Sequence, residues 1–142
     1  LLQQSPISLR QSGSKWELYT FAGGRINTLL ARALARLLCT EVSNDNFSVD
    51  IKFGSSQPIE ENDVWNALKT IAQPDFFSPD QLIQLAQGLP RGRLSKFQPL
   101  LPAEQEARFL IDRLFDPQGV QELLRRHLDA WIRSSSEVKP GR

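Results

Sequence analysis

The chain contains no methionine, one cysteine and one histidine among its 142 residues. A single cysteine, Cys39, cannot form an intramolecular disulfide, and together with His127 it supplies too few ligands for a Cys/His zinc site. This cysteine usage suits a reducing cytoplasm. Because methionine is absent and position 1 is leucine, we expect the chain to be a domain of a longer polypeptide.

Sequence motifs for nucleotide chemistry are also missing. No Gly-rich loop ends in Gly-Lys-Ser or Gly-Lys-Thr, and no Asp-Glu pair ends an apolar run as in a Mg²⁺-binding ATPase strand. His127 lies on the apolar stripe of a predicted helix, which favours a structural histidine over a catalytic one. Cys39 ends another apolar helix and is interpreted as a small core residue. We therefore expect no catalytic residue, metal or cofactor in this chain.

Long apolar runs are absent as well, since the longest, 26–39, is interrupted by two arginines and is not expected to span a bilayer. The hydrophobic fraction of 40% and the charged fraction of 23% are typical of one globular domain. Charge is uneven, with a net of +4 over 1–40, −6 over 41–90 and +3 over 91–142. This distribution indicates a basic face for nucleic acid and an acidic face for another partner.

Hydrophobic periodicity predicts strands in the first part of the chain and helices after it. The predicted strands are 7–10, 15–21 and 46–53, the last with Phe47, Val49, Ile51 and Phe53 on its buried face. Between them, 26–39 has apolar residues at i, i+3, i+4, i+7 and i+8, which predicts an amphipathic helix. We expect an α+β fold, in which this helix packs on a small antiparallel sheet of about three or more strands.

The second part of the chain is predicted to be helical. The predicted helices are 59–73, a short one after the capping box at 78–81, 102–115, and 116 to about 133. We expect one domain over 1–133, with a mixed strand and helix part at 1–58 and a helical part at 59–133, followed by a flexible tail at 134–142.

Three arginines mark one flank of the first helix. Arg25, Arg32 and Arg36 are seven and four residues apart, so they form a stripe beside the apolar face. Such a stripe can follow the phosphates of a nucleic acid, or it can be a solvated flank. Because the three side chains lie off the apolar stripe, we expect their replacement to leave the fold intact.

The turn before this helix is rich in glycine. Gly23 and Gly24 precede a helix N-terminus, where backbone amides, the helix dipole and Arg25 favour a phosphate. In the alternative interpretation, the two glycines allow a tight strand-to-helix reversal and Asn27 bonds to local backbone.

A short basic stretch at 91–97 is a further candidate. Arg93 and Lys96 are its candidate phosphate contacts, and Phe97 has a ring able to stack on a base. In the alternative interpretation, this stretch is an ordered loop whose Leu94 and Phe97 fill the core.

Several of these residues resemble a known family. The sequence WELYTFAGGRINTLL at 16–30 resembles the segment that opens the C-terminal accessory domain of Lhr-like superfamily 2 helicases, the DEAD/H-associated region. The predicted strand at 46–53 stands where that family has its next strand. LSKFQPLLP at 94–102 and LFDPQG at 114–119 resemble tail motifs of the same helicases.

The resemblance implies that the parent protein is an ATP-dependent DNA or RNA helicase, whose motor domains would hold ATP and Mg²⁺. This chain would be its non-catalytic accessory domain in the cytoplasm, contacting single-stranded nucleic acid beside the motor domains, with no membrane partner. The expected contact residues are Arg25, Asn27, Arg32, Arg36, Arg93, Lys96 and Phe97, with Gly23 and Gly24 as a phosphate turn. The alternative is a protein–protein adaptor that uses the acidic region 41–90, with Glu60, Glu61 and Asp63 at a helix start.

Overall fold

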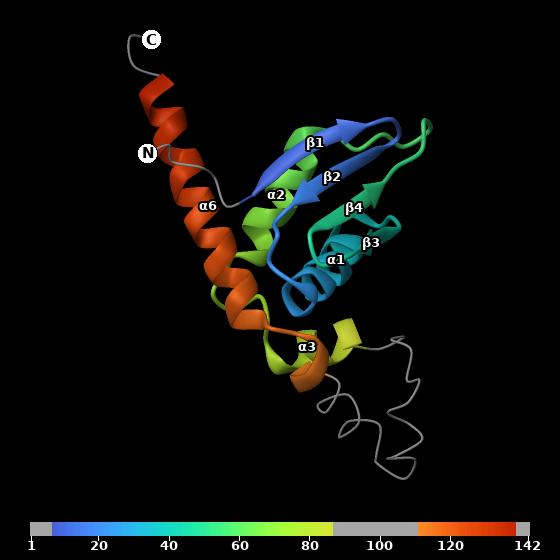
Figure 1. The fold of residues 1–142 in the computed structure, drawn as a ribbon, viewed down its shortest axis with the longest axis vertical. Helices are drawn as coiled ribbons and strands as arrows, with labels where there is room; N and C mark the ends of the chain where they lie inside the picture. The colour runs from blue at the N-terminus through green and yellow to red at the C-terminus, as the bar shows by residue number, and fades with distance from the viewer. Residues whose placement is uncertain (1–6, 87–110, 139–142) are drawn as a thin grey trace.

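The fold is a four-stranded sheet with helices on one of its faces (Figure 1). The computed structural model describes residues 7–86 and 111–138, and for residues 129–138 it describes the backbone only. The α+β class and the antiparallel sheet are confirmed. The elements are β1 Ser8–Ser12, β2 Lys15–Tyr19, α1 Gly24–Leu38, β3 Val42–Asn44, β4 Ser48–Lys52, α2 Glu61–Ile71, α3 Pro79–Ala86 and α6 Pro117–Val138.

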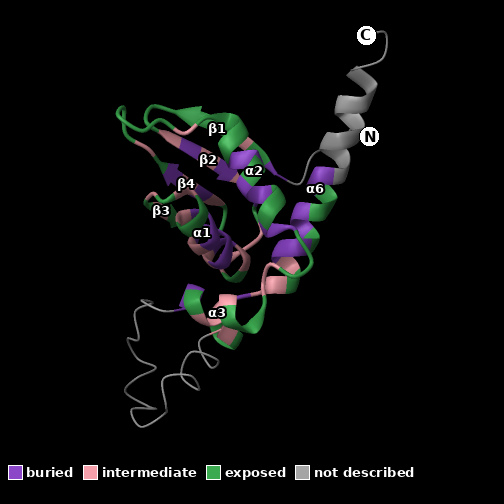
Figure 2. Cartoon of the chain, turned by 180° about the vertical axis from the view of Figure 1, so that it is seen from behind, coloured by how far each residue is buried: buried purple, intermediate pink, exposed green. Residues whose placement is uncertain are grey.

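The sheet has the strand order β1-β2-β4-β3, and every neighbouring pair is antiparallel. Residues opposite each other share a face, so Leu18 lies beside Val49 and Trp16 beside Ile51 on the buried side. Seen from behind, α1 and α2 lie over this buried side (Figure 2). Among residues 7–86 and 111–138, no helix or strand lies over the opposite face (Figure 1), which we call the open face.

Helix α1 is the centre of the core. Leu29, Leu30 and Leu34 on its apolar stripe are fully buried, because α1 packs against the sheet on one side and against α2 and α6 on the other. The side chain of Trp16 ties the sheet to the chain that leads into α2, since its Nε1 donates a hydrogen bond of 2.7 Å to the carbonyl of Ile59.

Helix α6 completes the core from the far side. Phe115, Val120 and Leu124 are fully buried or nearly so, and the side-chain amide of Gln121 donates to the carbonyls of Ile71 and Gln73 at the C-terminus of α2. These bonds satisfy carbonyls that the end of α2 leaves without helical partners. The backbone of α6 remains helical to Val138, beyond the expected end at 133.

Two predictions about the sheet region were wrong. Phe47 was expected in the core but is 58% exposed, because it lies in the β3–β4 turn, where the strand alternation no longer applies. Cys39 was also expected in the core but is exposed, because it follows the end of α1 in the left-handed conformation (φ 54°) that turns the chain away.

One strand was not predicted individually. β3 has only three residues, and its sequence Val-Ser-Asn is too short and too polar to show alternation. Of the helix predicted over 102–115, only 111–115 lie within the described residues; 111–114 are helical and Phe115 is not. None of the helices described over 7–86 and 111–138 has the length and apolar character needed to cross a membrane.

Candidate nucleic-acid interface

The arginine stripe lies on one side of α1, as predicted, and reaches the helical part of the domain. The guanidinium of Arg25 donates to the carbonyls of Asp112, at 2.9 Å, and Phe115, at 2.7 Å. These carbonyls lie at the end of the helical turn 111–114. A cation at a helix C-terminus satisfies carbonyls without helical partners and interacts favourably with the helix dipole.

The other two arginines contact the end of α3. Nε of Arg32 donates to the carbonyl of Leu85 at 2.5 Å, and Arg36 donates to the side-chain oxygen of Gln84 at 2.6 Å. Arg32 is half-buried, and this burial lowers the pKa of its guanidinium. Together with Arg25, these side chains connect α1 to the ends of two helical segments, and we call the three residues the arginine clamp.

The glycine turn is a tight strand-to-helix reversal, but the side chain of Asn27 does not bond to local backbone. Asn27 is fully buried; its side-chain oxygen accepts from the hydroxyl of Thr20 at 2.6 Å, and its amide donates to the carbonyl of Asp45 at 2.9 Å. Gly23 adopts a φ of 93°, which favours glycine, and its N–H donates to the carbonyl of Asn46. Asn27 was expected at a surface contact; in the structure its side chain joins two turns inside the protein.

The remaining predicted contacts, Arg93, Lys96 and Phe97, lie outside the described residues, as does the basic stretch 91–97.

Sequence reasoning did not single out the three aromatic rings on the open face. Tyr19 and Phe21 stack with their ring centroids 6.1 Å apart, and Phe21 and Phe47 are 5.9 Å apart at a tilt of 57°. Phe21 is 71% exposed and Phe47 is 58% exposed. We call these three residues the aromatic cluster.

The backbone holds the aromatic cluster in place. The carbonyl of Phe47 accepts hydrogen bonds from the N–H groups of Thr20 and Phe21, so the turn after β2 and the turn before β4 are joined. The carboxylate of Asp45 accepts from the N–H groups of Phe47 and Ser48, both at 2.8 Å, and these bonds lower the pKa of Asp45. Both phenylalanine rings therefore project from hydrogen-bonded turns.

Phe21 also has an unusual backbone conformation. Its φ is 53°, in the left-handed region that a bulky side chain rarely occupies. Such a conformation persists where the surrounding structure imposes it, and it is found most often at functional sites. Here the turn keeps a large apolar ring in solvent at a conformational cost.

Charged groups border the cluster on the open face. The guanidinium of Arg10 contacts the carboxylate of Glu17 at 2.7 Å and lies 5.6 Å from the centre of the Tyr19 ring. Lys15 pairs with Glu17 and Asp50. The hydrogen bond from Arg10, followed by that from Tyr19, lowers the pKa of Glu17. The face therefore combines exposed rings with paired acids and bases.

Part of this cluster was detectable in the sequence. The alternation that buries Trp16 and Leu18 places Glu17, Tyr19 and Phe21 together on the other face. Phe47 gave no such signal, because the same alternation in β4 predicts it on the buried face.

His127 is buried, as the sequence indicated, and its ring stacks on Trp65 with centroids 4.9 Å apart and planes 15° apart. Burial lowers the pKa of His127 from its ordinary value of 6.5. Among the described residues, no three His, Cys, Asp or Glu side chains are grouped so that they could hold a metal ion.

This lowered pKa predicts a pH dependence of stability. Below pH 6.5 the unfolded chain binds a proton at His127 more readily than the folded chain, so the free energy of unfolding should fall as the pH drops through this value and level off below the folded pKa. Urea unfolding of the native chain and of His127→Phe, between pH 8 and pH 5, measures the effect. If the free energy of unfolding changed equally with pH near pH 6 in both proteins, His127 would not be the cause of the pH dependence.

Comparison with known proteins finds no match to this chain among family models, curated proteins or solved structures.

Proposed function

We propose that this chain is the non-catalytic accessory domain of a cytoplasmic DNA or RNA helicase, and that it contacts single-stranded nucleic acid through the aromatic cluster. The observation that carries the proposal is Phe21, a ring that is 71% exposed on a left-handed backbone and lies beside two other rings. The resemblance of 16–30 to the helicase accessory domain supports the same function.

Stacking explains why exposed rings suit this ligand. Each base of a single strand has a π-face, and stacking on an aromatic side chain contributes about 1–3 kcal/mol per base with little sequence preference. In a duplex these faces are covered by neighbouring base pairs, so the aromatic cluster favours single strands. The rigid turns at Phe21 and Phe47 reduce the entropy lost on binding.

The charges of the open face predict a shallow salt dependence. Sheet register places the bases Arg10, Lys15 and Lys52 on this face with the acids Glu17 and Asp50, and Lys52 pairs with Glu41, so three bases meet three acids. When a protein neutralises one phosphate of a single strand, the logarithm of the binding constant falls with the logarithm of the salt concentration, with a slope of about −0.7. Stacking, rather than phosphate contact, should therefore provide most of the affinity.

The test is the binding of an oligothymidylate of about 12 nucleotides, followed by fluorescence anisotropy. Phe21→Asn should weaken binding by about 5- to 100-fold, because it removes a stacking ring. Asparagine tolerates the left-handed backbone, so the fold should persist.

A matched control is Leu37→Asn, which replaces an exposed apolar residue on the helical side of the sheet. It should leave binding unchanged. Equal affinities of the native chain and Phe21→Asn, with both proteins folded by circular dichroism, would exclude the aromatic cluster as the contact.

A further inference from the structure

A groove lies between α1 and α2, on the side of the sheet opposite the aromatic cluster. It has a volume of about 350 Å³ and is lined by Leu37, Leu38, Ile59, Asp63, Asn66, Ala67 and Thr70. The α2 residues of this set are spaced at i, i+3, i+4 and i+7, so the groove follows one stripe of that helix for about 10 Å.

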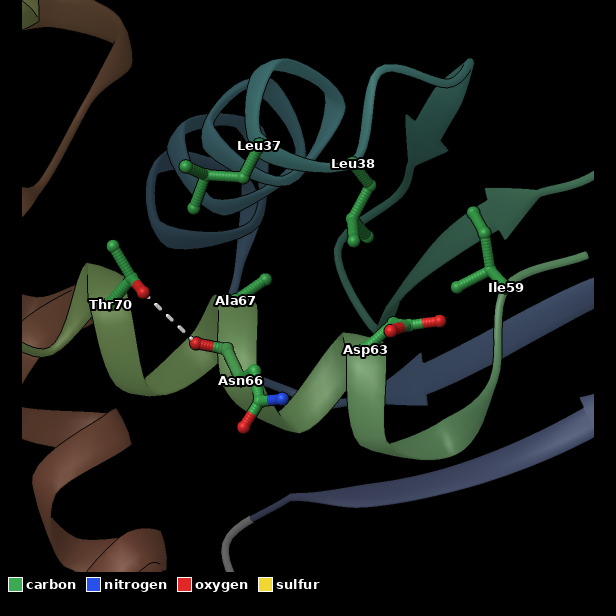
Figure 3. A pocket seen from close by; sticks show the side chains of 7 residues that line it. All are labelled: Leu37, Leu38, Ile59, Asp63, Asn66, Ala67 and Thr70. Atoms are coloured by element: carbon green, nitrogen blue, oxygen red, sulfur yellow. Dashed lines mark hydrogen bonds between the residues drawn. The ribbon is translucent and has the colours of Figure 1, made fainter. Parts of the chain in front are cut away.

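The floor of the groove is apolar. Figure 3 shows the side chains of Leu38, Ile59 and Ala67 directed into the space between the helices, with Leu37 above them on α1. Leu37 is 37% exposed, one of the few large apolar residues exposed on the described surface. An apolar floor with an exposed leucine on its wall suits the side chain of a partner, such as leucine or isoleucine.

The rim of the groove is acidic. Asp63 lines it, and the exposed Glu60 precedes α2, whereas the carboxylate of Glu61 accepts a hydrogen bond from Nε1 of Trp65, which does not line the groove. The carboxylate of Asp63 accepts a hydrogen bond of 2.9 Å from the N–H of Glu60 and therefore stays fixed at the helix N-terminus. None of the seven lining residues is basic. The rim thus complements a partner with positive charge.

We infer that this groove binds a protein segment that carries leucine or isoleucine side chains on one face and lysine or arginine beside them. The apolar side chains occupy the floor, and the basic side chains face Asp63 and Glu60. Because the groove and the aromatic cluster lie on opposite sides of the sheet, the domain has room for this segment and a nucleic acid strand at once.

The probe is a helical peptide of leucine and lysine, about 14 residues long. The control peptide has glutamate in place of every lysine. Titration into the ¹⁵N-labelled 142-residue chain should shift the amide signals of Leu37, Leu38, Asn66, Ala67 and Thr70 most with the lysine peptide. The glutamate peptide should produce no saturable shift.

Leu37→Lys tests the site. It removes an exposed apolar side chain and adds a charge that repels the lysine peptide, so affinity should fall about fivefold or more. Ser12→Lys adds the same charge at an exposed position on β1, away from the groove, and should leave peptide affinity unchanged. If Leu37→Lys does not fold, Thr70→Lys, at an exposed position on α2, replaces it.

Shifts scattered over the acidic surface, or equal affinities for the native chain and the groove variants, would overturn this inference. Such a result leaves the proposed nucleic-acid contact untouched, because oligothymidylate binding depends on the opposite face.

Discussion

Replacing Arg25, Arg32 and Arg36 together with glutamine is expected to lower the free energy of unfolding by about 2–4 kcal/mol. Most of the loss should come from Arg32, which is half-buried and donates to the carbonyl of Leu85. A smaller part should come from Arg25, which is exposed but donates to the carbonyls of Asp112 and Phe115. Arg36 is exposed and should contribute little. This reverses the expectation from sequence that the fold tolerates these replacements. Urea unfolding, followed by tryptophan fluorescence, measures the change.

Arg10→Gln is the matched control, since Arg10 forms an exposed ion pair with Glu17 on the sheet and should contribute at most about 1 kcal/mol. A triple variant as stable as the native chain would show that the arginine clamp is a solvated flank. The arginines would then again be free to serve as phosphate contacts.

Leu34→Ala is expected to destabilise the fold by about 2–5 kcal/mol. Leu34 is fully buried on α1, between the sheet and the helical part, so its truncation leaves a cavity as well as removing apolar burial. Chemical denaturation gives the free energy, and an unchanged m-value would show that the folded and unfolded states keep their compactness.

The comparison residue is Leu37, one turn further along the same helix and 37% exposed. Leu37→Ala leaves no closed cavity and should cost clearly less than Leu34→Ala. If the two substitutions cost the same, α1 does not pack through the stripe that the structure shows.

The sequence predicted the elements whose pattern is local. The alternation in β2 and β4 and the apolar stripe of α1 located the main elements and most of their buried faces, because side-chain direction within a strand or helix follows from spacing alone. The Ser78 cap also followed from sequence, and its hydroxyl accepts from the N–H of Gln81.

Long-range partners could not be predicted in this way. The groups that bind the arginine clamp lie 48 to 90 positions further along the chain. The spacing of the three arginines on α1 would be the same if they were solvated, bound phosphates or bonded within the protein. The exposure of Phe47 depends on the turn fixed by Asp45, which overrides the alternation of β4. The aromatic cluster, which combines two distant turns, therefore emerged only from the structure.

Helix α1 lies between β2 and β4 in the sequence, although the two strands are neighbours in the sheet, and this has a consequence for the order of folding. The hairpins β1–β2 and β3–β4 and the helix between them each form from neighbouring residues. Pairing β2 with β4 instead closes a loop of about 30 residues, from Tyr19 to Ser48. The conformational entropy of this loop is lost before contacts between the two strands can compensate for the loss. Phe21 follows β2 and Phe47 precedes β4, so the aromatic cluster forms only in this late step, and a partly folded chain does not present it.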